Sequence, residues 1–283
     1  MSTEHGKLYV VATPIGNLDD VSPRAGRVLA QANVIAAEDT RHSGRLLQHL
    51  GVSTELVACH DHNERAVVDG LVARLLRGDD VALISDAGTP LLNDPGYLLV
   101  NQAHAHGIEV VCVPGPSAIT AALSVCGLPV NRFAFEGYLP EKSTARRTLL
   151  QQLVHEARTL VFFETPHRIE RALQDLVTVF GSERRAAIAR ELTKRFETVR
   201  RDTLGGLLAW IRAGAEQQRG EFVIVVEGAA SMPGPDDEEL RHMLGTLLKL
   251  LSVKDAAAVA AELTGRPRNE LYALALKMKQ PGN

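Results

Sequence analysis

The first 125 residues alternate between short apolar runs and segments with helical periodicity, and this alternation constrains the fold most strongly. The apolar runs are 7–13, 33–37, 81–85 and 109–113, and the helix-like segments are 22–32, 43–50, 64–77 and 97–106. Runs that are apolar at nearly every position are typical of strands buried on both faces. The pattern predicts an α/β fold with a mostly parallel sheet that helices cover on both sides.

The second half repeats this alternation and ends in a helical tail. Its expected strands are 132–136, 159–164, 185–190 and 221–227, and its expected helices are 143–155, 167–179 and 203–213. The stretch 231–239 has the composition of a linker, and three helices are expected around and after it, at 236–250, 253–264 and 267–279. We therefore predict an N-terminal α/β domain at 1–120, a C-terminal α/β domain at 121–230 and a helical appendage at 236–283.

The last two expected helices are joined by a tight turn, Thr264-Gly265-Arg266-Pro267. Two helices joined through a glycine turn form either a helix-turn-helix reader of nucleic acid or a hairpin that only packs. On geometry alone, the packing hairpin is the favoured interpretation of the two.

Composition excludes several classes of protein. With 45% hydrophobic and 23% charged residues among 283, the chain is neither disordered nor collagen-like. Its longest apolar runs fall well short of the ~18–20 residues of a membrane helix, and its polar start does not resemble a signal peptide. A globular protein without a membrane segment is expected.

Neither the cysteines nor the histidines indicate a metal centre, and no metal is expected. Cys59, Cys112 and Cys126 lie far apart without ligand spacing, which is typical of the reducing cytoplasm. His60 and His62 alternate on an extended segment and would supply only half of a metal site, so surface or hydrogen-bonded histidines are favoured.

The net charge of −3 hides an asymmetry between the two halves. Residues 1–125 carry 8 basic and 14 acidic side chains, whereas residues 126–283 carry 23 and 20. An acidic balance argues mildly against a nucleic-acid partner, because phosphate binding usually needs a basic surplus. The two halves are therefore expected to face different partners.

Three loops rich in glycine and proline each follow an expected strand. They begin T-P-I-G-N-L at Thr13, S-D-A-G-T-P at Ser85 and V-P-G-P-S-A at Val113. Ligands of open α/β sheets bind beyond the carboxyl ends of the strands, so three such loops favour a small-molecule pocket over ordinary turns. The sequence contains no G-x-G, no P-loop and no G-x-S-x-G, which excludes the commonest occupants of such a pocket.

A series of ordered motifs covers nearly the whole chain: V-A-T-P-I-G-N-L-D-D, A-A-E-D-T-R-H, S-D-A-G-T-P, D-P-G-Y, P-G-P-S-A, F-E-G-Y-L-P, F-F-E-T-P-H-R, A-R-E-L-T-K, G-E-F-V-I-V-V-E-G and E-L-Y-A-L-A-L. Together they resemble the tetrapyrrole methylase superfamily, and more closely its bacterial branch that methylates ribosomal RNA. Two features depart from the pigment-methylating relatives. The T-P-I-G-N-L loop replaces their glycine-rich first loop, and Thr89 stands at the Asp position of their G-D-P motif. Both departures lower the odds of a porphyrin-like substrate.

The resemblance implies two α/β domains with S-adenosylmethionine in the cleft between them, and a homodimer. It also implies 2′-O-methylation of a cytidine ribose in the decoding centre of 16S rRNA, with the small ribosomal subunit as a partner. The cofactor-binding residues that carry over by motif are Pro14, Ile15, Gly16, Asp86, Ala87, Gly88, Pro90, Ser117, Ala118, Phe163, Glu164, Leu192 and Phe222.

The reaction that the resemblance implies also calls for a general base, because a ribose hydroxyl is a poor nucleophile at neutral pH. Asp39 is the first candidate, since it heads a loop that also offers Arg41 to a phosphate, and Glu38 and Asp94 follow. An equally open interpretation is that Asp39 caps the following helix or pairs with Arg41.

RNA contacts are expected at local clusters of cations, because phosphate contacts set register and affinity. The candidates are Arg41, Arg45, Lys142, Arg146, Arg147, Lys194 and Arg195. The segment 141–147 is the most persuasive, although a run of charges is more often a solvated face. The helical tail resembles the family's helix-turn-helix appendage and would add a second contact.

Two other functions stay open at this stage. A methylase of a corrin- or porphyrin-type small molecule would need neither the basic segments nor the helical tail. If the chain were a non-catalytic ribosome-binding protein that keeps the cofactor pocket as a relic, its loop motifs would be expected to be degraded. All three loops here are intact.

Overall fold

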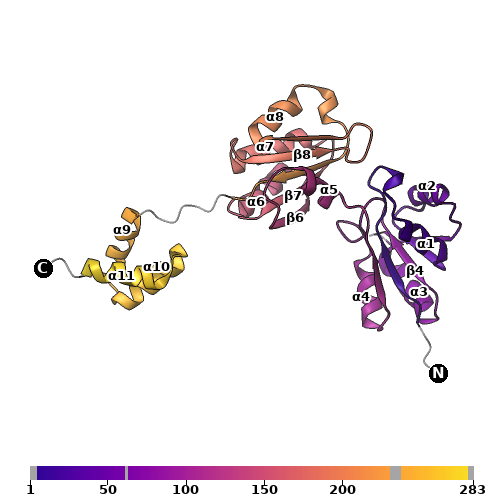
Figure 1. Cartoon of the computed structure of the whole chain (residues 1–283), viewed down its shortest axis with the longest axis horizontal. Coiled ribbons are helices and arrows are strands. Elements are labelled where there is room, and N and C mark those ends of the chain that lie inside the picture. The colour runs from indigo at the N-terminus through magenta and orange to yellow at the C-terminus, as the bar shows by residue number, and fades with distance from the viewer. Residues whose placement is uncertain (1–4, 61–62, 230–236, 280–283) are drawn as a thin grey trace. The chain divides into compact units, whose positions relative to one another are not determined.

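The computed structural model describes residues 5–60, 63–229 and 237–279. The described residues up to Gly228 form one unit and those from Ala229 form a second. The first unit contains two five-stranded sheets with their helices, and the second contains helices (Figure 1). None of the described helices is both long and apolar enough to cross a membrane.

The N-terminal sheet is parallel throughout, as the apolar runs predict. Its strands lie in the order β3-β2-β4-β1-β5, and every neighbouring pair is parallel. Their bounds are Leu8–Val11 for β1, Val34–Ala37 for β2, Glu55–Ala58 for β3, Val81–Ile84 for β4 and Val110–Val113 for β5. Strand β3 was not expected, because E-L-V-A is a short run at the edge of the sheet with little pattern of its own.

Helices cover both faces of this sheet, which confirms the expectation. They are α1 (Pro23–Gln31), α2 (Thr40–Leu50), α3 (Glu64–Leu76) and α4 (Tyr97–Ala105), and a short 3-10 helix η1 spans Leu18–Asp20. Along β2, Val34 and Ala36 pack with residues of α3 and α4, whereas Ile35 and Ala37 pack with residues of α1 and α2. This alternation is why the strand is apolar at every position.

The C-terminal sheet is mixed rather than parallel. Its strands lie in the order β6-β7-β10-β8-β9, with β6 parallel to β7 and every other pair antiparallel. Their bounds are Phe133–Tyr138 for β6, Thr159–Glu164 for β7, Arg185–Arg190 for β8, Thr198–Thr203 for β9 and Phe222–Val226 for β10. Strand β9, T-V-R-R-D-T, was not expected because it is a polar strand at the sheet edge, where charge protects against unwanted pairing.

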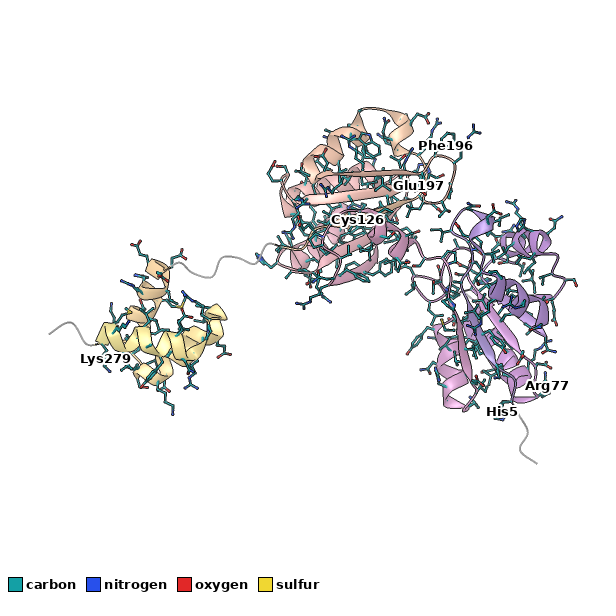
Figure 2. All side chains as sticks on the ribbon, viewed as in Figure 1. His5, Arg77, Cys126, Phe196, Glu197 and Lys279 are labelled. Atoms are coloured by element: carbon teal, nitrogen blue, oxygen red, sulfur yellow. The ribbon has the colours of Figure 1, made fainter. Side chains whose placement is uncertain are left out.

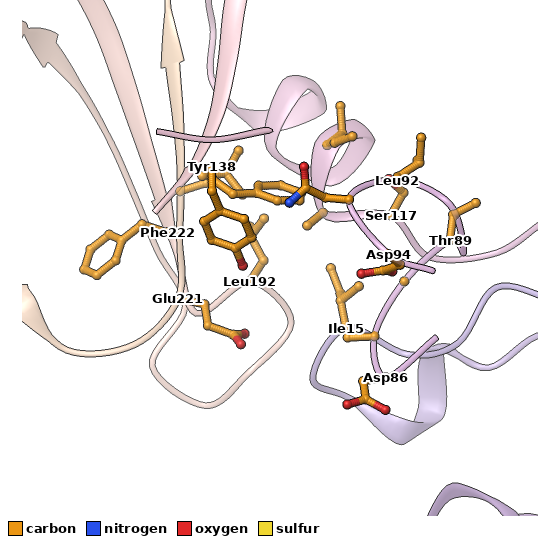
Figure 3. A pocket seen from close by; sticks show the side chains of 18 of the residues that line it. Ile15, Asp86, Thr89, Leu92, Asp94, Ser117, Tyr138, Leu192, Glu221 and Phe222 are labelled. Carbon is orange, nitrogen blue, oxygen red and sulfur yellow. The ribbon is translucent and has the colours of Figure 1, made fainter. Parts of the chain in front are cut away.

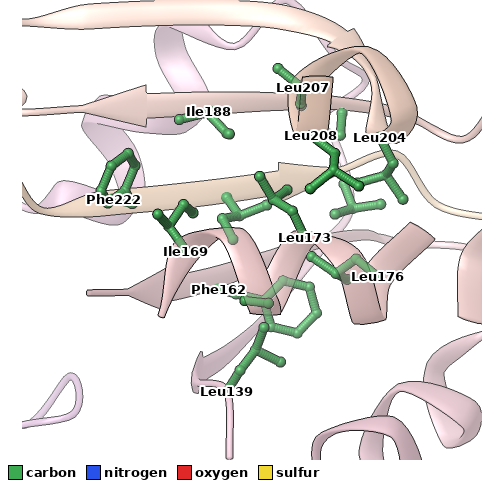
Figure 4. Packing of buried hydrophobic residues seen from close by; sticks show 14 of the residues in the cluster. Leu139, Phe162, Ile169, Leu173, Leu176, Ile188, Leu204, Leu207, Leu208 and Phe222 are labelled. Atoms are coloured by element: carbon green, nitrogen blue, oxygen red, sulfur yellow. The ribbon is translucent and has the colours of Figure 1, made fainter. Parts of the chain in front are cut away.

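Two layers of helices enclose the C-terminal sheet. One face packs against α6 (Ser143–Leu153), α7 (Ile169–Phe180) and α8 (Leu204–Arg212) around buried side chains such as Phe162, Leu173 and Leu207 (Figure 4). The other face packs against α5 (Ala118–Val125), and a 3-10 helix η2 spans Ala215–Gln218. The small-residue helix α5 therefore belongs with the second sheet, although it directly follows a loop of the first.

The second unit is a bundle of helices around a small apolar core. The helices are α9 (Asp237–Leu247), α10 (Val253–Thr264) and α11 (Arg268–Lys279), which agree closely with the expected segments. Ser252 caps the start of α10, and Gly265 ends it in the left-handed region at φ 69°. Much of the stretch expected to be a linker lies outside the described residues.

Candidate active site

The three glycine- and proline-rich loops meet because they follow three neighbouring strands, β4, β1 and β5. The carboxyl ends of parallel strands share one edge of the sheet. Thr13 and Gly88 exchange two backbone hydrogen bonds of 2.8 and 3.0 Å, which join the first loop to the second. The Thr89 hydroxyl donates to the Pro116 carbonyl at 3.1 Å, which joins the second loop to the third.

Gly88 lies where these loops come closest. Its φ of +83° falls in the left-handed region, and a Cβ added there would lie 3.3 Å from Ile15 Cγ2. Only glycine adopts this φ without strain, and any side chain at this position would also crowd Ile15. Gly88 also lines the cavity that lies beside these loops.

A cavity of about 250 Å³ opens beside Gly88 and is bounded by both sheets. Figure 3 shows side chains of the N-terminal loops, such as Ile15 and Asp94, facing Tyr138 of β6 and, from loops next to the C-terminal sheet, Leu192 and Glu221. The cavity therefore uses residues that lie up to about two hundred positions apart in the chain.

Most residues that the motifs predict as cofactor-binding line this cavity. Those that do are Ile15, Asp86, Ala87, Gly88, Ser117, Ala118, Phe163, Glu164, Leu192 and Phe222. Pro14, Gly16 and Pro90 are not among the lining residues. Gly16 instead allows a close approach, because a Cβ there would lie 2.5 Å from Lys194 Cγ.

Eight further residues line the cavity without having been predicted: Thr89, Leu92, Asn93, Ile119, Tyr138, Ala189, Glu221 and Val223. Several lie inside the quoted motifs, next to predicted residues. Tyr138 ends the F-E-G-Y-L-P motif, and Glu221 precedes the strand that carries Phe222. The motifs could have indicated these two positions, but only the paired strands show that they face the cavity.

The cavity is rich in carboxylates. Glu38, Asp86, Asp94, Glu164 and Glu221 line it, and no Lys, Arg or His is among its lining residues, all of which the structure describes. Carboxylates gathered around a small cavity favour a ligand that carries positive charge. Apolar groups, including Ile15 and Leu192, would hold an uncharged part of the same ligand.

Glu164 is the most deeply buried of these acids, with a side chain 0% exposed. Its carboxylate accepts a hydrogen bond from the Thr165 backbone N–H at 2.8 Å and forms an ion pair with Arg168 at 3.1 Å. Burial raises the pKa of Glu164, and the contacts with Thr165 and Arg168 oppose that rise. Arg168 also donates to the Leu139 carbonyl, so the same side chain holds the end of the segment that carries Tyr138.

Tyr138 contributes an aromatic ring and a hydroxyl to the cavity. Its ring lies edge-to-face with Phe163 at 5.5 Å between centroids. Burial raises the pKa of Tyr138, and the negative charges of Glu221, Asp94 and Glu164 raise it further. The hydroxyl therefore stays protonated at neutral pH and is available as a hydrogen-bond donor.

The segment that carries Asp94 has an unusual backbone. Leu91 and Asn93 have φ of 71° and 73°, in the region that favours glycine. A Cβ at Gly137, where strand β6 bulges, would lie 2.4 Å from Asn93 Oδ1, so the two sheets approach closely here. Strained backbone is found most often at sites that need a fixed geometry.

The three candidate bases are placed differently. Glu38 and Asp94 line the cavity, whereas Asp39 does not. Asp39 caps α2 and accepts hydrogen bonds from Arg41 at 2.8, 2.9 and 3.2 Å. These bonds hold the pKa of Asp39 well below its usual range, so it is a poor proton acceptor. Of the two interpretations of Asp39, the structure supports the helix cap.

Arg146 corrects an expectation about RNA contacts. The residue is 2% exposed, and its guanidinium forms an ion pair with buried Asp175 at 2.7 Å. It also donates to the carbonyls of Pro140 and Glu141, at 3.0 and 3.1 Å. Arg146 is therefore not accessible to RNA, and it instead fixes the segment between β6 and α6.

Other predicted RNA-binding cations are partly neutralised. Arg147 pairs with Asp175 at 2.6 Å, and the Lys194 ammonium lies between Glu191 and Glu221 at 2.9 and 2.8 Å. Burial would lower the pKa of Lys194, but its bonds to Glu221 and Glu191 outweigh this and raise it. The remaining candidates are exposed: Arg41, which pairs with Asp39, and Arg45, Lys142 and Arg195.

The described residues contain no group of three or more His, Cys, Asp or Glu side chains placed to hold a metal ion. Of the two histidines considered above, His60 and His62, the second lies outside the residues that the structure describes. His60 lies before α3, and its backbone N–H donates to Asn63 Oδ1 at 2.8 Å.

Comparison with known proteins extends the sequence resemblance. Residues 7–208 match the family described as Tetrapyrrole (Corrin/Porphyrin) Methylases, and residues 234–279 match the family described as RsmI C-terminal HTH domain. The chain is 55% identical over 274 residues to the protein named Ribosomal RNA small subunit methyltransferase I from Pseudomonas aeruginosa, covering 96% of this chain and 97% of that relative. The protein of the same name from Escherichia coli O157:H7 is 47% identical, with coverage of 97% and 96%.

Solved structures of more distant proteins share the fold. The methyltransferase CobJ matches with a TM-score of 0.58 at 21% identity, over 80% of this chain and 95% of that one. Uroporphyrin-III-C-methyltransferase from Thermus thermophilus matches with a TM-score of 0.54 at 24% identity, over 78% and 94%. At these identities the matches show the arrangement of the two sheets and leave the substrate open.

Proposed function

The chain belongs to the tetrapyrrole methylase family, and we propose that it transfers a methyl group from S-adenosylmethionine to the 2′-hydroxyl of a cytidine ribose in the decoding centre of 16S rRNA. One observation of the structure carries the proposal: a cavity between two sheets has five carboxylates and no cation among its lining residues, and two of these acids, Glu164 and Glu221, pair with Arg168 and Lys194 outside that lining. The likeness to relatives named Ribosomal RNA small subunit methyltransferase I extends over 96% of the chain and favours RNA over a tetrapyrrole as acceptor.

The residues of the cavity fit S-adenosylmethionine. Bound there, the sulfonium would supply an already activated methyl group. The backbone at Gly88 and the neighbouring Asp86 suit the polar parts of the cofactor, whereas Ile15, Leu192 and Phe163 suit its adenine. The acidic lining favours a positive charge, and walls from both sheets would hold the cofactor in one orientation.

Replacing Gly88 by valine is expected to weaken S-adenosylmethionine binding at least about tenfold. The new side chain would strain a backbone at φ +83° and would crowd Ile15, 3.3 Å from the added Cβ. Isothermal titration calorimetry measures the effect. The matched control is Gly107→Val, at φ +68° with nothing within 4 Å of an added Cβ. Equal affinity in the two variants would contradict this role for Gly88.

On the acceptor side, we assign the general base to Asp94. This carboxylate lines the cavity in a strained segment, and it faces the side where Tyr138 lies (Figure 3). Asp94 would accept the proton of the ribose hydroxyl as the hydroxyl attacks, and the Tyr138 hydroxyl would donate a hydrogen bond that orients the acceptor. Glu38 also lines the cavity and is the second candidate.

RNA affinity must come from outside the acidic cavity. The exposed cations Arg45, Lys142 and Arg195 supply phosphate contacts from the first unit. The helical unit, whose sequence matches a helix-turn-helix domain, supplies a second contact. A cytoplasmic homodimer acting on the small ribosomal subunit completes the proposal.

The direct test uses purified protein, tritiated S-adenosylmethionine and 30S subunits from a strain that lacks the modification. We expect one label per subunit, on the 2′-oxygen of a cytidine in the decoding centre. Label on a base would contradict the proposed chemistry. Transfer to a porphyrin or corrin instead of RNA would favour the small-molecule alternative, and binding to subunits without transfer would favour the non-catalytic one.

A further inference from the structure

The loop between β8 and β9, residues 191–197, begins at the cavity and carries an exposed aromatic side chain. Leu192 lines the cavity, and four residues later Phe196 is 66% exposed. Figure 2 shows Phe196 beside Glu197 on this loop of the C-terminal sheet. A single exposed apolar residue is common on protein surfaces, so the meaning of Phe196 depends on the contacts around it.

The loop is held in one shape by its own contacts. Glu191 and Thr193 have φ of 52° and 65°, a backbone that non-glycine residues adopt only when the surroundings hold it. The Thr193 N–H donates to Glu197 Oε2 at 2.6 Å, and the backbone N–H groups of Lys194 and Glu197 each donate within the loop at 3.0 Å. The exposed ring of Phe196 is therefore presented on a fixed support.

Positive charge lies directly over this ring. The Arg195 guanidinium is 5.6 Å from the ring centroid of Phe196, and Arg195 is exposed. Neighbouring Lys194 is different, because Glu191 and Glu221 neutralise it. An exposed aromatic ring next to an exposed arginine is a combination that stacks on unpaired bases and contacts phosphate.

The charge of the cavity explains why such a platform is needed. Carboxylates that suit a cationic cofactor repel the phosphates of an RNA strand. For a ribose hydroxyl to reach Asp94, its nucleotide must leave the regular stack, and a group outside the cavity must hold the strand. The loop that continues from Leu192 lies at the edge of the cavity, where such a group is needed.

We infer that Phe196 stacks on an unpaired nucleobase of the RNA, next to the nucleotide whose ribose enters the cavity, with Arg195 on the adjoining phosphate. This inference rests on the proposed function and deepens it. It assigns RNA positioning to Phe196, whereas Leu192, four residues earlier, lines the cavity proposed for the cofactor.

The test is steady-state methylation of unmodified 30S subunits by Phe196→Ala. We expect KM for the subunit to rise at least about fivefold, since stacking on one base contributes that much or more. The S-adenosylmethionine Kd and kcat stay unchanged, and Phe196→Trp restores KM because it keeps an aromatic face. Arg195→Ala should lower the slope of log affinity against log salt by about one.

Phe133→Ala is the matched control. Phe133 is 42% exposed, but it is the first residue of β6, at the opposite end of that strand from cavity-lining Tyr138. Its KM should equal that of the wild type. An unchanged KM in Phe196→Ala would overturn the inference, and so would an oligomer that dissociates on this substitution, because the ring would then belong to an interface between copies.

Wild-type methylation separates this inference from the proposed function. If the wild type does not label RNA, the proposed function fails, and subunit binding by the wild type and Phe196→Ala is then compared by filter binding. Equal affinities in that assay would also overturn the stacking role.

Discussion

Asp94→Asn is expected to lower kcat for RNA methylation at least about 100-fold, the usual contribution of a general base. Asparagine keeps the shape of the side chain but cannot accept the proton of the ribose hydroxyl. The affinity for S-adenosylmethionine should change little, because cavity shape is preserved. Single-turnover assays with saturating cofactor and subunits measure the chemical step directly.

Asp39→Asn provides the comparison that separates the two candidates. Asparagine still caps α2, so the helix is retained. Because Arg41 already holds the pKa of Asp39 far below its usual range, loss of this carboxylate should leave kcat within about threefold of wild type. A normal rate in Asp94→Asn together with a large loss in Asp39→Asn would reverse the assignment, and a large loss only in Glu38→Gln would move it to Glu38.

Asp175→Asn is expected to destabilise the first unit by about 3–5 kcal/mol. Asp175 lies on α7 with a side chain 3% exposed, and it pairs with buried Arg146 at 2.7 Å and with Arg147 at 2.6 Å. Ser143 adds hydrogen bonds of 2.9 and 3.1 Å. The substitution would leave the Arg146 charge buried without a counter-charge, which is the costly case for buried ion pairs.

Urea unfolding followed by circular dichroism measures this change, and Glu170→Gln is its control. Glu170 is also on α7, but its pair with Arg212 at 2.9 Å is exposed, so its loss should change the free energy of unfolding by less than about 1 kcal/mol. Similar losses in the two variants would mean that the buried cluster contributes no more than a surface pair.

The effect of Asp175→Asn should depend on pH. Burial alone would raise the pKa of Asp175, but hydrogen bonds from Arg147, Ser143 and Arg146 outweigh it and lower the pKa. A carboxyl with a lowered folded-state pKa stabilises the protein above its unfolded pKa, and this contribution is lost as pH falls through the folded value. The difference in free energy of unfolding between wild type and Asp175→Asn should therefore reach its full value near pH 6 and should decrease below about pH 4.

Local patterns predicted four of the five strands of the N-terminal sheet. Continuous apolar runs predicted strands β1, β2, β4 and β5, because a strand buried on both faces has no polar position. The edge strands β3 and β9 were not expected, since β3 is not fully buried and begins with a charged residue, and β9 carries charges at its exposed positions. The mixed pairing of the second sheet was also absent from the prediction, because strand direction depends on contacts between distant segments.

In the candidate site, the motifs indicated which loops line the cavity more reliably than which side chains do. Glu38 and Asp39 are adjacent, yet only Glu38 lines the cavity. Arg146 and Arg147 are adjacent on α6, yet one is 3% and the other 47% exposed at the side chain. Neighbouring residues point in different directions on a strand end or a helix, so a motif locates the segment but not its active member.

The sequence by itself determined the family, the alternating α/β architecture and the helical tail, because these depend on periodicity and on motifs read along the chain. Only the tertiary structure decided which charged side chains line the cavity, which are buried and which are exposed. Pairing of Phe222 with Glu164 across two antiparallel strands brings the two into one wall of the cavity, although 57 residues lie between them in the chain. Burial then assigns Arg146 to the core and leaves Arg195 in solvent, because whether a charge is paired or free depends on neighbours that only folding supplies.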